Sequence, residues 1–226
     1  MTHRRNISAF ISTIALFSFL MAAAGAHAQE EGKEKGKSKW LTDVEVSVDI
    51  VGPCMKAFGS YGHYEAAARL NLRGHYFPVI EIGYAKCDKD EDTNNLNYTT
   101  SAPFFKIGCD FNVLKNKNDD YRLYIGFRYA YSSFDFDLTS PGIEDPVWGG
   151  TAAYSTYGNE CTYQWLEAVG GVQAKICGPL HLGWSIRYCA RVSDDCGSLG
   201  EAWYVPGYGT AGRSNFAATF DIIFVI

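Results

Sequence analysis

Hydrophobic and polar residues alternate along much of this chain with the two-residue period of β-strands. In the segment 121–131 (YRLYIGFRYAY), large apolar residues take the odd positions, and Arg122, Gly126 and Arg128 are among the residues between them. Because successive side chains of a strand point to opposite faces, one face of this strand is apolar and the other polar. Similar patterns predict eight strands in all, over residues 42–50, 62–73, 76–86, 104–114, 121–131, 164–176, 180–192 and 216–226.

The connections between these segments alternate between short and long. The short ones are 74–75, 115–120 and 177–179, and the long ones are 51–61, 87–103, 132–163 and 193–215. With the N-terminus in the periplasm, every short connection falls on the periplasmic side and every long one outside, which is typical of membrane barrels. The sequence therefore predicts an all-β fold: an eight-stranded antiparallel up-and-down transmembrane β-barrel with short periplasmic turns and long outer loops.

Charged residues of both signs gather on the polar face of the predicted strands. They are Glu45, Asp49, Glu65, Arg69, Arg73, Glu81, Lys106, Asp110, Arg128, Glu167, Lys175, Arg187, Arg191 and Asp221. In an enclosed lumen such ions need partners, because an unpaired buried ion is strongly destabilising. We therefore predict a lumen filled by a charged network, with the apolar face toward lipid. A secreted, soluble lipocalin-like binder with its apolar face inside is the alternative.

The N-terminal region has the composition of a targeting segment. Residues 1–28 combine a basic start, an apolar run and a small-residue ending, which predicts a secretory signal peptide. Residues 29–39 are charged and carry no apolar side chain, so we expect a flexible lead-in there and the barrel over 40–226. The predicted location is the outer membrane of a Gram-negative bacterium. The net charge of −5, without a basic stripe, argues against nucleic acid as a partner.

The chain contains seven cysteines, an odd number that leaves at least one outside an intramolecular disulfide. Cys109 lies in a predicted strand and Cys177 in a predicted periplasmic turn. The others lie in or beside the outer loops, where one or two disulfides would form in an oxidising compartment: Cys54, Cys87, Cys161, Cys189 and Cys196. No C-x-x-C spacing supports a zinc site, so we expect no metal and no cofactor.

Aromatic residues are frequent in the two longest outer loops and suit recognition of sugars, proteins or surface lipid. The candidate recognition residues are Trp148, Trp203, Tyr204, Pro206, Gly207 and Tyr208, with a turn at Pro206-Gly207. The alternative is that residues 203–209 fold down and cap the mouth of the barrel.

Catalysis by a lipid-modifying enzyme at the outer rim is the alternative function. His63 lies near the predicted rim with Glu65 on the same face, and Ser60 or Ser132 would serve as the nucleophile. No spacing ties these groups together, so a histidine hydrogen-bonded in the polar lumen is the simpler interpretation and no catalytic residue is assigned. A pore is disfavoured, because side chains fill an eight-stranded interior.

Four blocks resemble a family of uncharacterised small outer-membrane barrels, a domain of unknown function from Bacteroidetes-type bacteria. The blocks are PFFKIGCDFNVL, YIGFRYAYSSFDFD, WLEAVGGVQAKICGPLHLGWSIRYCARV and WYVPGYG. The resemblance implies an outer-membrane barrel and transfers no activity, ligand or functional residue. We therefore expect a monomeric barrel of structural or surface-interaction type, in contact with outer-membrane lipid, whose outer loops bind a surface glycan or protein.

Overall fold

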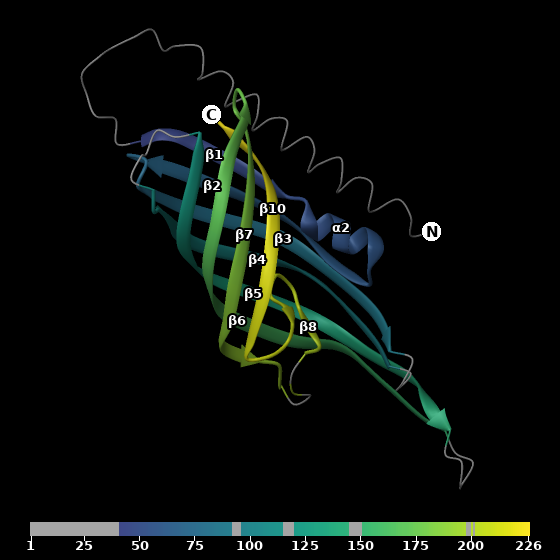
Figure 1. The fold of residues 1–226 in the computed structure, drawn as a ribbon. Helices are drawn as coiled ribbons and strands as arrows, with labels where there is room; N and C mark the ends of the chain where they lie inside the picture. The colour runs from purple at the N-terminus through teal and green to yellow at the C-terminus, as the bar shows by residue number, and fades with distance from the viewer. Residues whose placement is uncertain (1–40, 92–95, 115–119, 145–150, 198–199, 201) are drawn as a thin grey trace, which may run out of the picture. The chain divides into compact units, whose positions relative to one another are not determined.

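The computed structural model describes residues 41–91, 96–114, 120–144, 151–197, 200 and 202–226 (Figure 1). The predicted signal peptide, the lead-in and Trp148 lie outside these residues. Within the described ranges, ten strands and one helix follow in chain order: β1 (Leu41–Asp49), α2 (Val51–Phe58), β2 (Tyr61–Leu72), β3 (Tyr76–Glu91), β4 (Leu96–Asn112), β5 (Tyr121–Glu144), β6 (Thr151–Cys177), β7 (Leu180–Asp195), β8 (Tyr204–Val205), β9 (Gly209–Thr210) and β10 (Ser214–Val225). None of the described helices is long and apolar enough to cross a bilayer.

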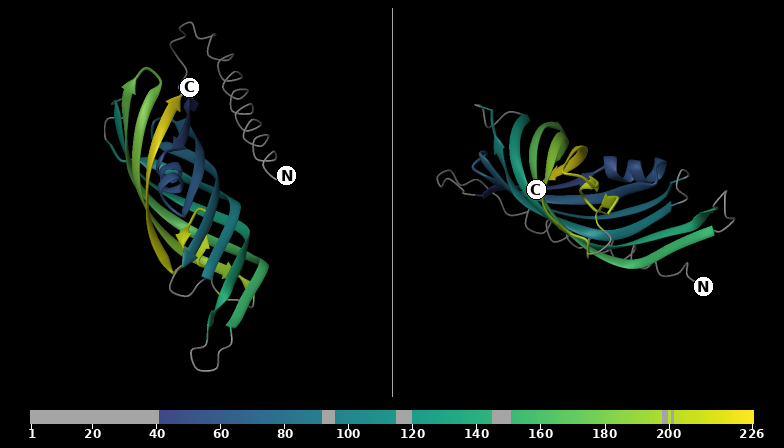
Figure 2. Two further views of the ribbon diagram at one scale, coloured as in Figure 1. Left: turned by 90° about the vertical axis from the view of Figure 1, so that its right-hand side faces the viewer. Right: turned by 90° about the horizontal axis from the view of Figure 1, so that it is seen from below.

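Eight of these strands form one closed antiparallel barrel, as the alternation predicts. Their order around the barrel is β1-β10-β7-β6-β5-β4-β3-β2, so each barrel strand pairs with the next barrel strand in the chain, and the last, β10, also pairs with the first, β1 (Figures 1 and 2). The barrel closes between β1 and β10, from the pair Glu45↔Val225 to the pair Asp49↔Asp221. We call the end with the β2–β3 and β6–β7 connections the turn end, and the opposite end the hairpin end.

Two strand pairs continue well past their predicted limits. The segments predicted as loops 87–103 and 132–163 are largely paired strands, up to the pairs Glu91↔Leu96 and Glu144↔Thr151, so the predicted limits are wrong. The reason lies in the two faces of β5 beyond Tyr131. Phe134 and Phe136 stay buried inside, while the outward-facing neighbours become polar. The inner face thus keeps the strand in the sheet after the outer face has lost its apolar character.

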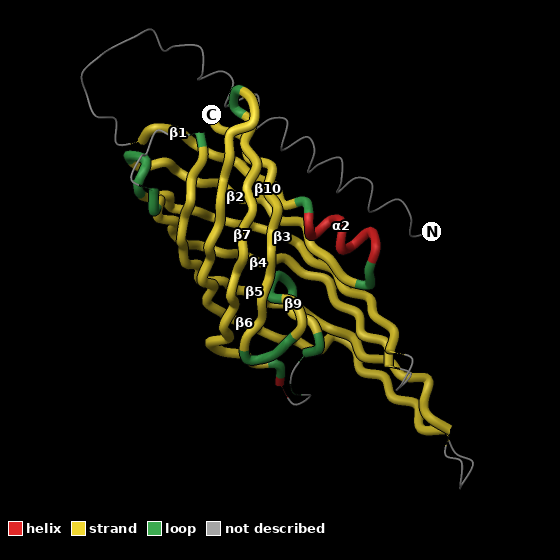
Figure 3. Tube along the Cα trace, in the orientation of Figure 1, coloured by secondary structure: helices red, strands yellow, loops and turns green. Residues whose placement is uncertain are grey.

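The predicted loop 51–61 contains the helix α2, which Figure 3 shows in red between β1 and β2. The helix packs closely on β2 because Gly52 has no side chain. A Cβ atom at this position would collide with the carbonyl oxygen of His63. This contact holds α2 beside the outer part of β2.

The two faces of the barrel wall differ sharply in chemistry. Large apolar side chains are exposed on the outside of the strands, among them Ile80, Ile82, Ile107, Ile125, Phe127, Leu166, Val172, Trp184 and Ile186. The inward-facing positions hold buried charged residues toward the turn end and buried aromatic residues toward the hairpin end. The functional candidates therefore lie within two differently filled halves of one interior.

Candidate functional site

The centre of the charged half is Glu81, which three arginines surround. Its carboxylate accepts hydrogen bonds from Arg128 Nε at 3.0 Å and from Arg187 Nη1 at 2.8 Å, and Arg69 lies 4.0 Å away. Asp110 joins the same cluster, because its Oδ2 accepts from Arg128 Nη2 at 2.9 Å and from Arg69 Nε at 3.2 Å. All these side chains are buried.

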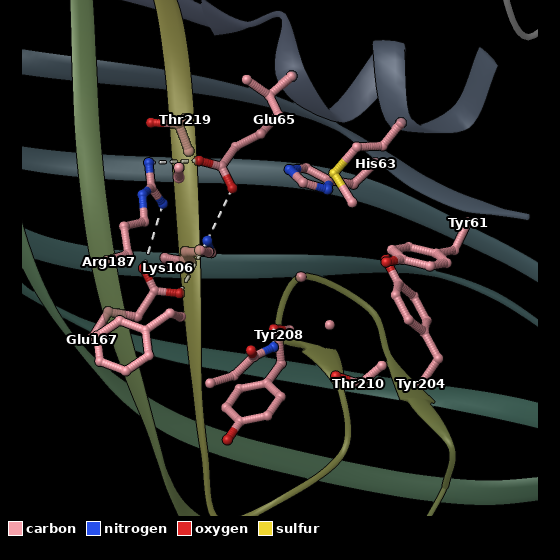
Figure 4. A pocket seen from close by; sticks show the side chains of 18 residues that line it. Tyr61, His63, Glu65, Lys106, Glu167, Arg187, Tyr204, Tyr208, Thr210 and Thr219 are labelled. Carbon is pink, nitrogen blue, oxygen red and sulfur yellow. Dashed lines mark hydrogen bonds and ion pairs between the residues drawn. The ribbon is translucent and has the colours of Figure 1, made fainter. Parts of the chain in front are cut away.

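A second cluster extends the network toward the hairpin end through Arg187. Lys106 Nζ lies 2.9 Å from Glu65 and 3.1 Å from Glu167, and Arg187 Nη2 lies 2.9 Å from Glu65 (Figure 4). Among the described residues, the continuous network thus contains four cations and four anions: Arg69, Lys106, Arg128 and Arg187 with Glu65, Glu81, Asp110 and Glu167. The balance matters because removing one member would leave a buried ion without its partner.

Glu45 belongs to a separate ion pair near the turn end. Both of its oxygens accept hydrogen bonds from Arg122, each at 2.8 Å, and Arg122 also bonds Gln173. The guanidinium lies 3.8 Å from the centre of the Phe77 ring. Arg122 was missing from the predicted network, although it shares the strand face of Arg128 and could have been found by that parity.

Six of the predicted residues are not among the eight members of the continuous network: Glu45, Asp49, Arg73, Lys175, Arg191 and Asp221. Three of the six are cations that lie near strand ends. Arg73 is exposed in the β2–β3 turn, with a positive φ of 57°. Lys175 is 45% exposed and faces Asp120 at 4.0 Å at the turn end, and Arg191 lies 3.4 Å from Asp194 near the hairpin end. These cations sit at strand ends, where water reaches them and offsets the cost of burial.

Asp49 lies where β1, α2, β2 and β10 meet. Its carboxylate accepts hydrogen bonds from the backbone N–H groups of Gly52 (2.6 Å) and Phe220 (3.1 Å), and His63 Nε2 lies 3.5 Å away. Asp49 therefore ties the end of the β1–β10 closure to the start of α2. Asp221, its partner in the strand register, is buried, and its Oδ2 has no hydrogen-bond partner among the described residues.

The aromatic half is closed by the segment 202–212, which carries β8 and β9 and which we call the plug. Tyr204, Pro206 and Tyr208 are buried there, Trp203 is half-buried, and Gly207 takes a φ of +81° in the turn between the two short strands. Tyr98 Oη donates to the Tyr204 carbonyl at 2.8 Å, and Asn215 Nδ2 donates to the Tyr208 carbonyl at 3.0 Å. The structure thus places these loop aromatics inside the mouth.

The plug packs against aromatic residues from several strands. Tyr208 lies against Trp165 and Tyr163, with ring centroids 5.6 and 5.0 Å away. Burial raises the pKa of the Tyr98 and Tyr204 phenols well above their ordinary range, so both are neutral. Burial also raises the pKa of the neighbouring Cys87 thiol to about 11. This half is held by apolar contacts and neutral hydrogen bonds.

One disulfide joins the wall to the segment that leads into the plug. It links Cys161 on β6 to Cys196, which follows β7. The other three candidates are free thiols: Cys54 is exposed, and Cys87 and Cys189 are buried. The structure therefore supplies the connectivity that the sequence left open.

A cavity of about 340 Å³ lies between the charged network and the plug. Figure 4 shows Glu65, Lys106, Glu167 and Arg187 on one side of it and Tyr204 and Tyr208 on the other. His63 also lines the cavity, between Asp49 and the charged cluster. This concave site combines charged, aromatic and histidine side chains.

The predicted catalytic grouping is not assembled around His63. Ser132 is buried elsewhere and its Oγ donates to the Pro103 carbonyl, and Ser60 is exposed at the start of β2. Neither serine lines the cavity. The described residues also hold no group of three or more His, Cys, Asp or Glu side chains arranged to bind a metal ion.

A protein-family model matches most of the chain. The model of the domain of unknown function DUF6048 matches residues 6–226. The chain belongs to the DUF6048 family. A search of curated proteins found no match to this DUF6048 chain.

Solved outer-membrane proteins are similar to the DUF6048 chain in fold. The attachment invasion locus protein Ail of Yersinia pestis is 8% identical, with a TM-score of 0.43, and the match covers 81% of this chain and 97% of Ail. A major outer membrane protein of Thermus thermophilus is 12% identical, with a TM-score of 0.47 and coverages of 81% and 98%. The N-terminal β-barrel domain of Pseudomonas aeruginosa OprF is 9% identical, with a TM-score of 0.35 and coverages of 84% and 100%.

Proposed function

We propose that this DUF6048 protein is an outer-membrane β-barrel of structural or surface-interaction type, with a closed lumen. The observation that carries the proposal is the change of outward-facing residues along β5. From Tyr121 to Tyr131 these residues are large and apolar, and from Ser133 onward they are polar or acidic. The apolar stretch of 11 residues matches the roughly 9–11 residues that a tilted strand needs to cross a bilayer.

The neighbouring strands change character at the same level. On β3 the exposed Ile82 and Tyr84 are followed by the exposed Lys86 and Asp88. Tyr131, which is also exposed, lies opposite Phe105 of β4 at this boundary. Aromatic residues at the edge of an apolar belt are typical of the membrane–water interface. The hairpins β3–β4 and β5–β6 would then extend into water outside the cell.

The filled interior supports a barrel that does not act as a pore. The charged network occupies the half toward the turn end, and the plug occupies the half toward the hairpin end. An eight-stranded barrel leaves a lumen only wide enough for such side chains. We propose that any surface ligand, a glycan or a protein, contacts the extended hairpins, where Tyr154 and Tyr157 are exposed. These residues replace the buried plug aromatics as recognition candidates.

The same proposal includes the predicted location and processing. The protein would reach the outer membrane of a Gram-negative bacterium after removal of residues 1–28, and would act there as a monomer. The resemblance of its sequence blocks implies a Bacteroidetes-type bacterium. Neither a cofactor nor a metal enters the proposal.

One introduced and one native cysteine at opposite ends of the barrel test the orientation. Tyr157 is exposed on β6 in the extended β5–β6 hairpin, and Cys177 is exposed where β6 ends at the turn end. Intact cells are treated with a polyethylene-glycol maleimide too large to pass porins, using Y157C/C54S/C109S/C177S and C54S/C109S variants. We expect the first variant, which carries the Tyr157→Cys change, to be modified, and the second only after the outer membrane is permeabilised. The reverse pattern, or a boiled and unboiled protein of equal gel mobility, would refute the proposal.

A conductance measurement tests the closed lumen. In planar bilayers the purified protein should give no stable channels, because paired charges and the plug fill the interior. Steady single-channel currents from the wild-type protein would show that the lumen conducts.

A further inference from the structure

One edge of strand β10 lacks a neighbouring strand toward the hairpin end. The ladder between β1 and β10 ends at the pair Asp49↔Asp221, whereas β10 extends back to Ser214. Among the described residues, no other strand pairs with this side of β10. We call the β1 side of residues 214–218 the open edge.

Backbone groups of the open edge have no partner strand. The N–H of Phe220 donates to Asp49 Oδ1 at 3.1 Å, and its carbonyl accepts from the N–H of Ile50 at 2.9 Å, so both groups point to the β1 side. Because backbone groups alternate sides along a strand, Phe216 and Ala218 direct theirs to the same side. Within the described part of the chain these groups make no hydrogen bond. A backbone edge of this kind is a template for pairing with another strand.

The helix α2 covers the edge of β2 that faces the same gap. A Cβ atom on Gly52 of α2 would collide with the carbonyl oxygen of His63, and a Cβ atom on Gly62 of β2 would collide with Lys56. The helix thus lies directly on the backbone of β2. The edges on the two sides of the gap therefore differ, because β2 is covered and β10 is not.

The cavity between network and plug adjoins the open edge. Phe216, Ala217 and Ala218 contribute to its lining together with Met55 of α2, so space remains between β10 and the helix. With about 340 Å³ the cavity is at the small end of ligand sites. It has room for a short extended segment and none for a folded domain.

The sequence of the open edge lacks the features that commonly protect an exposed strand. Such strands carry charged residues, proline or a bulge. Residues 214–220 (SNFAATF) contain no charged residue and no proline, and their pairing with β7 shows no register shift. The side chains beside the edge are apolar and accessible, since Phe216 is 72% and Met55 37% exposed.

We propose that the open edge binds an extended, uncharged peptide segment of another protein, which adds a short strand to β10. The backbone of this segment pairs with the N–H and carbonyl groups of Phe216 and Ala218. Main-chain hydrogen bonds give the affinity in this mode of recognition, and pockets for alternate side chains give the specificity. Side chains of the segment that point outward contact Phe216 and Met55 and are therefore apolar.

Side chains of the segment that point inward face the cavity, and the charges there are already paired. Lys106 lies 2.9 Å from Glu65 and 3.1 Å from Glu167, and Arg187 lies 2.9 Å from Glu65. A charged side chain brought into this lining would lose water without gaining a free counter-ion. The inward positions of the segment are therefore uncharged.

This inference assigns a peptide-binding edge to the barrel wall, whereas the proposed function places surface ligands on the extended hairpins. It depends on the strand register and on the cavity. It does not depend on the placement of the barrel in a membrane.

Binding of a model peptide to the purified protein in detergent, measured by native mass spectrometry, tests the open edge. The probe is an acetylated and amidated hexapeptide of alternating threonine and valine, and its control carries N-methyl groups on the central residues. N-methyl groups remove the donors and block the approach of a second strand. We expect one unmodified peptide per protein and at least about tenfold weaker binding of the methylated one, a difference of about 1.4 kcal/mol.

Ala218→Pro removes one donor from the open edge itself. Proline lacks the N–H that points into the gap, while the bonds to β7 come from the alternate residues, such as Arg213, whose carbonyl accepts from the Arg191 N–H. Ala218→Val is the matched control, because it adds a side chain of similar size and keeps the N–H. We expect A218P to bind the unmodified peptide at least about tenfold more weakly than A218V.

Heat modifiability shows whether each variant is folded, and the comparison of the two peptides on the wild-type protein needs no variant. Equal binding of the two peptides, equal binding by folded A218P and A218V, or no peptide complex at all would overturn the assignment. A protein dimer that A218V forms and A218P does not would assign the open edge to a second copy of the chain and would also overturn it. Because binding is measured in detergent, its failure is independent of the cysteine labelling that tests orientation on cells.

Discussion

The two halves of the barrel interior show two solutions to the same packing problem. Toward the turn end the wall encloses buried ion pairs, in which removal of one partner leaves the other charge unpaired. Toward the hairpin end it encloses aromatic rings of the plug. The ion network uses side chains of the wall itself, whereas the plug is a separate piece of chain held by one disulfide and a few hydrogen bonds. We therefore expect the charged half to control the stability of the barrel and the aromatic half to open locally.

The largest effect is expected from Arg128→Leu. This change removes one cation that Glu81 and Asp110 share in a buried site. Breaking a buried ion pair in this way lowers the free energy of unfolding by about 3–5 kcal/mol. The measurement is the temperature at which the folded band disappears on a detergent gel. Lys175→Leu is the control, because exposed pairs such as Lys175 with Asp120 contribute at most about 1 kcal/mol. Equal losses for both variants would show that Arg128 is not in a buried network.

Removal of the disulfide should lower the stability of the plug and leave the charged network intact. A C161S/C196S variant loses the link across a sequence separation of 35 residues, and we expect the plug to lose about 2–4 kcal/mol of stability. The measurement is alkylation of Cys87, quantified by peptide mass spectrometry. In the wild type a pKa of about 11 keeps the Cys87 thiol protonated at pH 8. The rate of its alkylation should therefore rise with pH until the pH reaches about 11.

In the C161S/C196S variant, opening of the plug removes the burial that raises the Cys87 pKa. Alkylation at pH 8 should then become faster, while the thermal transition of the barrel moves much less than in Arg128→Leu. A large thermal shift without faster alkylation would mean that the two halves unfold together.

Asp49→Ala should have an intermediate effect, because Asp49 joins α2 to β10 at the end of β1. The variant loses the acceptor of the Gly52 and Phe220 N–H groups, and we expect a cost of about 1–3 kcal/mol. Hydrogen exchange would show faster exchange in α2 and at Phe220, with the Glu81 region unchanged. Unchanged exchange at both places would show that this carboxylate does not hold α2 to β10.

The smallest effect is expected from Tyr98→Phe. The ring remains packed, and only the hydrogen bond from Tyr98 Oη to the Tyr204 carbonyl is lost, at a cost of about 0.5–1.5 kcal/mol. Cys87 alkylation should be slightly faster, and the thermal transition should stay within error of wild type. A shift as large as that of Arg128→Leu would show that the plug contributes to barrel stability as much as the network.

Three features of the sequence predicted much of the barrel. Alternation identified the eight strands, the connection lengths gave their antiparallel order, and the charges of both signs indicated the inner face that carries Glu81, Arg128 and Arg187. Alternation failed at strand ends, because Arg73 and Lys175 share that face but lie where water reaches them. It also stopped β5 at Tyr131, since a change of the outer face to polar residues looks like a loop while the inner face still packs.

The sequence by itself determined which residues share a face of each strand, because side chains alternate between the two faces, and the charges of both signs indicated which face points inward. The tertiary structure decided which of these residues meet. Glu81 contacts arginines from β2, β5 and β7 because curvature of the wall brings separate strands across the lumen, and local sequence carries no record of that distance. The unpaired edge of β10 has the same origin, because β1 pairs with β10 only as far as Asp49 while β10 extends from Ser214, and these unequal lengths meet only when the barrel closes.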